Sequence, residues 1–207
     1  MDIIIFYLAV LIFSVVIHEV SHGSAALMLG DSTAKNANRL TLNPLPHLDF
    51  MGSFLMPIFL LILTQGQGPI FGWAKPVPVN PYNLRNPRWD MAKVAMAGAG
   101  ANFALALAFG LALRLAPIPA QLAVLFSGIV TLNLLLGIFN LAPIPPLDGS
   151  KVLFAFIPDR FFNFKLFLEQ YGPMFLIFFI FFFGFIRIIF PIVSLAYYII
   201  VGQPPLI

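Results

Sequence analysis

Long apolar stretches, separated by short polar and proline-rich segments, dominate the chain. They lie at about residues 3–29, 50–64, 91–115, 121–141 and 173–201. Most of them are near or above the length of about 20 residues that a helix needs to cross a bilayer. The pattern predicts an all-α polytopic membrane protein with about four or five membrane-embedded helices.

Residues 66–85 break this pattern because they are rich in glycine and proline. Pro76 and Pro78 alternate with Val77 and Val79. A residue that precedes a proline disfavours helix, so this run is expected to be extended, as an edge strand or hairpin. We therefore predict a re-entrant or β-like segment at about 66–85.

Composition excludes a soluble fold, since 60% of the residues are hydrophobic and only 9% are charged, against about 25% charged in soluble domains. The sequence shows neither an internal repeat nor a linker, which predicts one integral membrane domain over 1–207. The chain has no cysteine, so a metal site must use histidine and carboxylate ligands. The net charge is +3, but the Lys and Arg residues are scattered, and no nucleic-acid partner is expected.

The first apolar stretch contains His18, Glu19 and His22, which spell HExxH. On a helix, positions i and i+4 share one face, so the two imidazoles can bind one Zn²⁺ while Glu19 acts as a base. Three ionisable groups at membrane depth are costly without a metal or a function, which weighs against two merely buried histidines. A cleaved signal peptide is the weaker alternative, because no Lys or Arg precedes Lys35.

A catalytic zinc site needs a third protein ligand. Asp148 is the favoured candidate because prolines turn the chain sharply just before it, directly after an apolar span. His47, in a proline-rich loop, is its main rival, and Glu169 is another candidate. If Asp148 is the ligand, it must lie on the same side of the membrane as His22.

HExxH in a first apolar helix, followed by a later span that ends in Asn140, prolines and LDG (residues 147–149), resembles the site-2 protease family. This is a family of intramembrane zinc metalloproteases, and the chain is similar to a compact form without a PDZ or CBS domain. A family signature, AGP followed by Asn, corresponds to residues 97–102, with Ala99 where Pro is common. We expect this departure to change local helix geometry more than chemistry.

The resemblance implies one Zn²⁺ per chain, with His18, His22 and Asp148 as ligands and Glu19 as catalytic base. It also implies a membrane-associated β element near the site. The expected substrate is a transmembrane or membrane-tethered protein, which must unwind before a carbonyl can reach the metal. Residues 73–83 either hold that unwound chain by edge pairing or form a structural plug over the site.

Three asparagines are candidates for binding the substrate backbone or an oxyanion: Asn140, Asn133 and Asn102. Hydrogen bonding between helices is the alternative, slightly favoured for Asn133 and Asn102. The other interpretations of the whole chain are a catalytically inactive zinc-binding membrane protein, a membrane metallohydrolase of another substrate, and a transporter. A transporter would be expected to show repeats and charged groups on several spans, and neither is present.

Positive charge predicts the orientation. Nearly all Lys and Arg residues fall on the side of the proposed zinc site if residues 50–85 leave that side and return to it, whereas Arg114 lies opposite. This places the site toward the cytoplasm of a multi-pass protein, which we expect in a prokaryotic cell membrane. The last apolar stretch is expected to bend at Gly184 and Pro191, and Arg187 within it either snorkels or marks a break.

Overall fold

The computed structural model describes residues 2–65, 72–182 and 185–206. Within these ranges every regular element is helical. The α-helices are α1 (Asp2–Met28), α2 (Thr33–Asn36), α3 (Met56–Leu63), α4 (Pro87–Leu115), α5 (Ala120–Asn140), α6 (Asp148–Phe156), α7 (Phe162–Phe182) and α8 (Phe185–Val201). A π-helical segment, η2 (Phe50–Leu55), runs directly into α3, and the 3-10 turns are η1 (Leu45–His47), η3 (Pro81–Asn83) and η4 (Asp159–Phe161).

Among the residues that the structure describes, three helices are long and apolar enough to cross a membrane: Ile3–Met28 in α1, α4 and α5. The fold class predicted from the sequence is therefore confirmed as all-helical, and the long apolar helices are consistent with a membrane protein. Two shorter apolar helical stretches, Phe50–Leu63 and Arg187–Val201, accompany them. The number of membrane-embedded helices stays a prediction.

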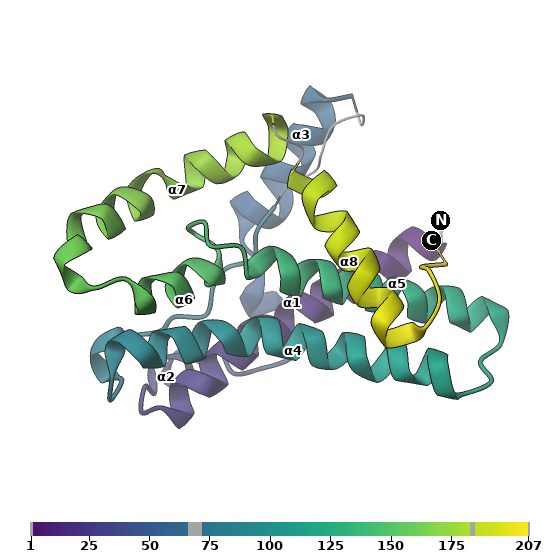
Figure 1. Cartoon of the computed structure of the whole chain (residues 1–207), viewed down its shortest axis with the longest axis horizontal. Helices are drawn as coiled ribbons and strands as arrows, with labels where there is room; N and C mark the ends of the chain where they lie inside the picture. The colour runs from purple at the N-terminus through teal and green to yellow at the C-terminus, as the bar shows by residue number, and fades with distance from the viewer. Residues whose placement is uncertain (1, 66–71, 183–184, 207) are drawn as a thin grey trace.

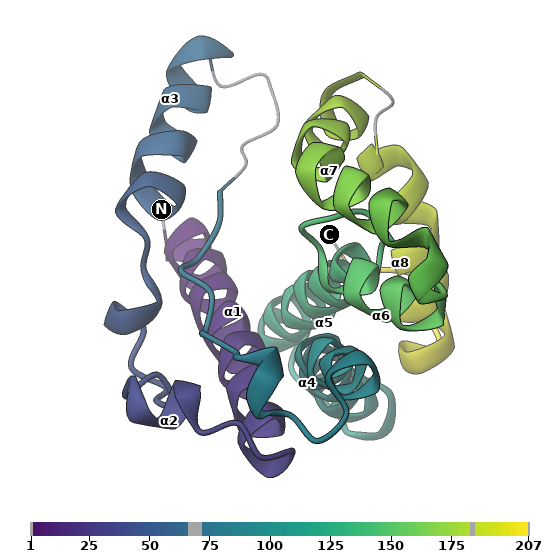
Figure 2. The ribbon, with the colours of Figure 1, turned by 90° about the vertical axis from the view of Figure 1, so that its left-hand side faces the viewer.

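Helix α4 lies at the centre of the molecule and packs against α1, α5, α6 and α8. Its buried positions are mostly small residues: Ala92, Ala95, Gly98, Ala99, Ala106 and Gly110. Small side chains let helix backbones approach closely, which is the usual way for helices to associate in lipid. Figures 1 and 2 show α1, α4 and α5 as neighbours, with α3 and α7 standing on opposite sides of this group.

A second packed region joins α4, α5, α7 and α8. Leu134, Leu176, Val193 and Tyr197 are among its buried side chains. The Tyr197 hydroxyl donates to Ser127 Oγ at 2.8 Å, so this polar pair is satisfied inside an apolar core. The core fixes α8 against α5.

The last apolar stretch forms two helices where a single stretch over 173–201 was predicted. Helix α7 begins at Phe162, and Pro173 lies inside it. A proline within a membrane helix is tolerated because neighbouring groups satisfy the freed carbonyl. Pro191 lies inside α8, and the expected bend at Gly184 falls outside the described residues.

Residues 72–80 are extended, as predicted, but the expected strand or hairpin is absent from the described part of 66–85. The backbone instead bonds to scattered partners: Trp73 N–H donates to the Gly52 carbonyl and Lys75 N–H to the His47 carbonyl. A ladder needs a regular partner strand, and Pro76 and Pro78 have no N–H to offer one. We call residues 72–80 the extended segment.

The polar connections gather at two ends of the molecule. Figure 1 shows α2, the start of α4 and the connection from α6 to α7 at one end, with both termini and the α4–α5 turn at the other. Arg114 lies at the second end, where its Nη1 donates to the Ile199 carbonyl at 3.1 Å. Arg187 is exposed on α8.

Candidate metal centre

Helix α1 presents His18 and His22 on one face, one turn apart, as the motif predicts. Their Nε2 atoms are 3.0 Å apart, and the two residues are only 5% and 7% exposed. Helix α1 is rich in apolar residues on all sides, so these two imidazoles and Glu19 form an isolated polar group within it.

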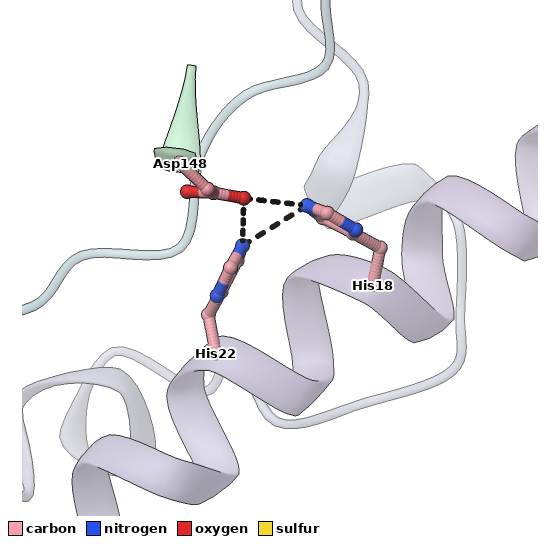
Figure 3. A group of neighbouring side chains, drawn as sticks. All are labelled: His18, His22 and Asp148. Carbon is pink, nitrogen blue, oxygen red and sulfur yellow. Dashed lines mark hydrogen bonds and ion pairs between the residues drawn. The ribbon is translucent and has the colours of Figure 1, made fainter. Parts of the chain in front are cut away.

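Asp148 reaches the same point from the first turn of α6. Its Oδ2 lies 3.0 Å from His18 Nε2 and 2.9 Å from His22 Nε2. Figure 3 shows one carboxylate oxygen directed at both rings, which come from consecutive turns of α1. The structure thus brings together the three residues predicted as metal ligands, and it meets the requirement that His22 and Asp148 share one side.

The outer nitrogen of each imidazole has a fixed role. His18 Nδ1–H donates to Asn102 Oδ1 at 2.7 Å, and His22 Nδ1–H donates to the Val94 carbonyl at 2.7 Å. In a neutral imidazole the other nitrogen then carries a lone pair. Both Nε2 lone pairs therefore face each other and the Asp148 carboxylate, which is a set of three electron-pair donors that a cation stabilises.

This donor set fits zinc. Two imidazole nitrogens and one carboxylate oxygen are the protein ligands of known catalytic zinc sites. Tetrahedral zinc with bonds of about 2.0–2.1 Å separates its ligand atoms by about 3.3 Å, and the separations here are 2.9–3.0 Å. The three side chains therefore need to move apart by only a few tenths of an ångström to bind zinc.

A polar network behind His18 contains two of the three candidate asparagines. Asn102 Nδ2 donates to Asn133 Oδ1 at 2.9 Å, and Asn133 Nδ2 donates to Ser14 Oγ at 3.0 Å. Both asparagines are fully buried. They connect α1, α4 and α5 and orient His18. Neither asparagine lines the cavity that opens beside His18, His22 and Asp148.

Gly98 allows α4 to approach the two histidines. A Cβ at this position would overlap Cε1 and Nε2 of His22 and Cε1 of His18. A Cβ at Gly100, two residues on, would meet no atom of the described neighbouring residues within 4 Å. Gly98 belongs to the glycine-containing signature noted in the sequence, but the sequence did not reveal its contact with both imidazoles.

A cavity of about 310 Å³ opens beside the three ligands. Glu19, Asn140 and Lys151 line it, together with Pro76, Val77 and Val79 of the extended segment. Glu19 Oε2 accepts a hydrogen bond from Val77 N–H at 2.7 Å. Asn140 donates its Nδ2 to the Leu136 carbonyl of its own helix at 2.9 Å, so its Oδ1 remains available to the cavity.

Asp31 anchors the far end of the extended segment next to α1. This buried carboxylate accepts from Asn80 N–H at 2.7 Å and from Asn83 Nδ2 at 2.8 Å. Burial by itself raises the pKa of Asp31, but the hydrogen bonds from Thr33, Asn83 and Asn80 outweigh it and lower the pKa below its ordinary value. Sequence reasoning missed this anchor, for which the only signal was a polar residue that ends the first apolar helix.

The two rival ligands lie elsewhere. His47 is 1% exposed, and its Nε2–H donates to the Thr41 carbonyl at 3.0 Å. The backbone carbonyl of His47 accepts a hydrogen bond from Lys75 N–H. It therefore supports the extended segment. Glu169 is exposed on α7.

The fold and the site define an all-helical protein with helices long and apolar enough to cross a membrane, and with a buried cluster of two histidines and one aspartate that could hold a metal ion. The chain matches the model of peptidase family M50 over residues 116–183. It is 40% identical over 158 residues to a protein of Bacillus subtilis named "Putative zinc metalloprotease YwhC", and the match covers 72% of this chain and 67% of that relative. The chain belongs to peptidase family M50, the site-2 protease family that its motifs resemble.

Two mycobacterial relatives carry names of the same form. Rip2 of Mycolicibacterium smegmatis is 36% identical over 148 residues, which are 68% of this chain and 52% of Rip2. Rip3 of Mycobacterium tuberculosis is 41% identical over 71 residues, which are 33% of this chain and 18% of Rip3. The matches thus span about half or less of these two longer relatives. No solved structure matches the chain significantly.

Proposed function

We propose that this protein is an intramembrane zinc endopeptidase with one Zn²⁺ per chain. His18, His22 and Asp148 hold the ion, and Glu19 is the catalytic base. The observation that carries the proposal is the convergence of three lone-pair donors within 3.0 Å of one another, beside a glutamate that lines the same cavity. The names of the relatives, which refer to zinc metalloproteases, support the choice of metal.

Zinc, when bound, acidifies a water molecule and polarises a peptide carbonyl. The residues of the chain transfer the proton and orient the metal ligands. Glu19 uses one carboxylate oxygen to accept the Val77 N–H, which leaves the other to take a proton from water and return it to the leaving amine. Asn102 and Val94 hold the imidazoles in the tautomer that directs both lone pairs inward.

The proposed substrate is a transmembrane or membrane-tethered protein whose helix is locally unwound. Asn140 lines the cavity, its amide oxygen has no hydrogen-bond partner among the described residues, and it can accept a hydrogen bond from the substrate backbone. Pro76 and Pro78 offer carbonyl acceptors to an extended chain. Among the residues that the structure describes, Asn140 is therefore the best of the three asparagines for contact with substrate.

The proposed membrane arrangement places the site toward the cytoplasm. Lys35, Arg88, Lys151 and Lys165 belong to elements at one end of the molecule, and Arg114 lies at the other (Figure 1). An excess of Lys and Arg marks the cytoplasmic side. In this arrangement α1, α4 and α5 span the bilayer, residues 50–85 enter and return, and the whole of 1–207 forms one catalytic domain of a prokaryotic cell membrane protein.

The test compares Glu19→Gln with Glu169→Gln, the equivalent change at the chain's other, exposed glutamate. Purified protein in detergent is analysed for zinc and incubated with labelled single-span membrane peptides. We expect Glu19→Gln to keep about one zinc per chain and to lose at least about 100-fold in turnover, while Glu169→Gln behaves as the unmodified protein. Zinc without hydrolysis in the unmodified protein would favour an inactive binding protein, and hydrolysis of non-peptide substrates alone would favour another metallohydrolase.

A further inference from the structure

The two carboxylate oxygens of Asp148 have different neighbours. Oδ2 faces both histidines, at 2.9 and 3.0 Å, whereas Oδ1 accepts a hydrogen bond from Lys151 Nζ at 3.2 Å. Lys151 lies one turn further along α6, so its side chain can fold back over the first turn of the helix. The lysine side chain is 41% exposed and lines the cavity.

A second aspartate–lysine pair in the chain has the same spacing but a different setting. Lys93 Nζ contacts Asp90 Oδ1 at 2.8 Å at the start of α4, and Asp90 Oδ2 accepts from Asn86 N–H at 2.8 Å. Both oxygens of Asp90 thus serve to hold the helix terminus. In Asp148 only one oxygen is held, and the other is presented to the histidines.

Carboxylates bind zinc through one oxygen or through two. A catalytic site needs three protein ligands and an open position. If Asp148 bound through both oxygens, it would fill the position that a reacting molecule requires. A cation fixed on Oδ1 prevents this, because that oxygen cannot turn toward the metal without losing its ammonium partner.

We infer that Lys151 is a positioning residue that keeps Asp148 a one-oxygen ligand and so preserves the open position of the metal. The inference rests on the zinc site proposed above. Lys151 acts through Asp148 and takes no part in proton transfer. Its removal also takes a positive charge away from the metal site, so metal affinity should not fall.

The experiment compares Lys151→Met, Lys151→Arg and the matched control Lys93→Met in the full chain. Methionine keeps the length and helix propensity of lysine and lacks its charge. Each protein is stripped of metal and titrated with Co²⁺, whose visible absorption weakens when a four-coordinate site gains a ligand. Zinc affinity is measured by competition with a chelator, and kcat and KM with a labelled single-span peptide.

We expect Lys151→Met to show weaker Co²⁺ absorption, zinc affinity equal to or above that of the unmodified protein, and kcat lower by about tenfold with little change in KM. Lys151→Arg should restore the spectrum and most of kcat. Lys93→Met should match the unmodified protein in its Co²⁺ spectrum, its zinc affinity and its kcat. An unchanged spectrum and kcat in Lys151→Met would overturn the inference alone, as would a loss of zinc affinity. Failure of the unmodified protein to bind either metal would overturn the proposed function as well.

Discussion

The proposed metal centre and the extended segment border the same cavity, but they are built in different ways. The centre is held by helices α1, α4 and α6, and its side chains are buried and bonded to other buried groups: His18 to Asn102, and Asn102 to Asn133. The extended segment, residues 72–80, has no regular secondary structure. Its N–H groups donate to Gly52, His47, Glu19 and Asp31, and its Trp73 and Lys75 carbonyls accept from Ser53 Oγ and Arg39 Nη2.

The proposed reaction has two requirements, and each region meets one of them. Metal ligands must stay within a few tenths of an ångström of their places, which packed helices and buried networks provide. A membrane-embedded substrate must enter and leave, which favours a covering element that separate hydrogen bonds hold in place of a regular helix or sheet. Changes in the packing that positions the three proposed ligands should therefore act mainly on zinc binding, and changes that loosen the segment should leave zinc binding unchanged.

The largest effect is expected from Gly98→Ala. The added methyl group would overlap both imidazoles, so the rings or α4 must move away from the positions that converge on Asp148. We expect zinc affinity to fall by about 100-fold and stability by about 1–3 kcal/mol. Chelator competition and thermal unfolding in detergent measure the two effects.

Gly100→Ala is the matched control in the same helix. Its methyl group would meet no described neighbour within 4 Å, and alanine favours an exposed helical position over glycine by about 0.8–1.0 kcal/mol. We expect unchanged zinc affinity and equal or higher stability. Equal zinc binding by both variants would show that close approach of α4 does not shape the centre.

The convergence of His18, His22 and Asp148 was easier to predict from the sequence than the contacts of the segment. HExxH fixes the relative positions of His18, Glu19 and His22 because helix geometry is regular. The prolines before Asp148 indicated where the chain turns back toward these residues. Contacts between distant elements have no such local rule. The bond from Val77 to Glu19 and the anchoring of Asn80 by Asp31 join residues more than 45 positions apart.

Side-chain roles also depended on packing that the sequence does not encode locally. Asn102, Asn133 and Asn140 are the same residue type in apolar helices, yet two lie in a buried network behind His18 and one faces the cavity. Pro76 and Pro78 exclude a helix at residues 72–80 and remove two N–H donors from any strand ladder, but the single hydrogen bonds that the segment makes instead depend on what surrounds it. Tertiary context decided both outcomes.

An intermediate effect is expected at Val77, where two substitutions separate the backbone from the side chain. Val77→Pro removes the N–H that donates to Glu19, between two residues that are already proline. A hydrogen bond to a charged group contributes about 1.5–3 kcal/mol, so we expect kcat/KM to fall by about tenfold with zinc content unchanged. Peptide hydrolysis and metal analysis are the measurements.

Val77→Ala is the control, because it keeps the N–H and removes only buried side-chain atoms that pack near Gly23. We expect kcat/KM within about twofold of the unmodified protein and a stability loss of about 1–2 kcal/mol. Higher activity in Val77→Pro than in Val77→Ala would contradict a positioning role for this bond. It would indicate that the segment is a plug that restrains Glu19.

The smallest effect is expected at Asp31, and it should depend on pH. The pKa of Asp31 is lowered in the folded protein, so its ionised form adds stability above the unfolded-chain pKa of about 3.9. This contribution is lost as the pH falls through the lower pKa of the folded state. Asp31→Asn cannot ionise, so it should lower the unfolding midpoint by a few degrees at pH 7, and the difference should shrink toward pH 3.

Zinc affinity should not change in Asp31→Asn, because Asp31 holds the extended segment and not the three ligands. The control is Asp159→Asn, whose side chain is 84% exposed and should leave the midpoint unchanged at every pH. Hydrogen exchange of the Val77, Val79 and Asn80 amides should rise only in Asp31→Asn, since Asn80 loses its carboxylate acceptor. A drop in zinc affinity together with unchanged exchange would place Asp31 on the metal side and remove the distinction between the two regions.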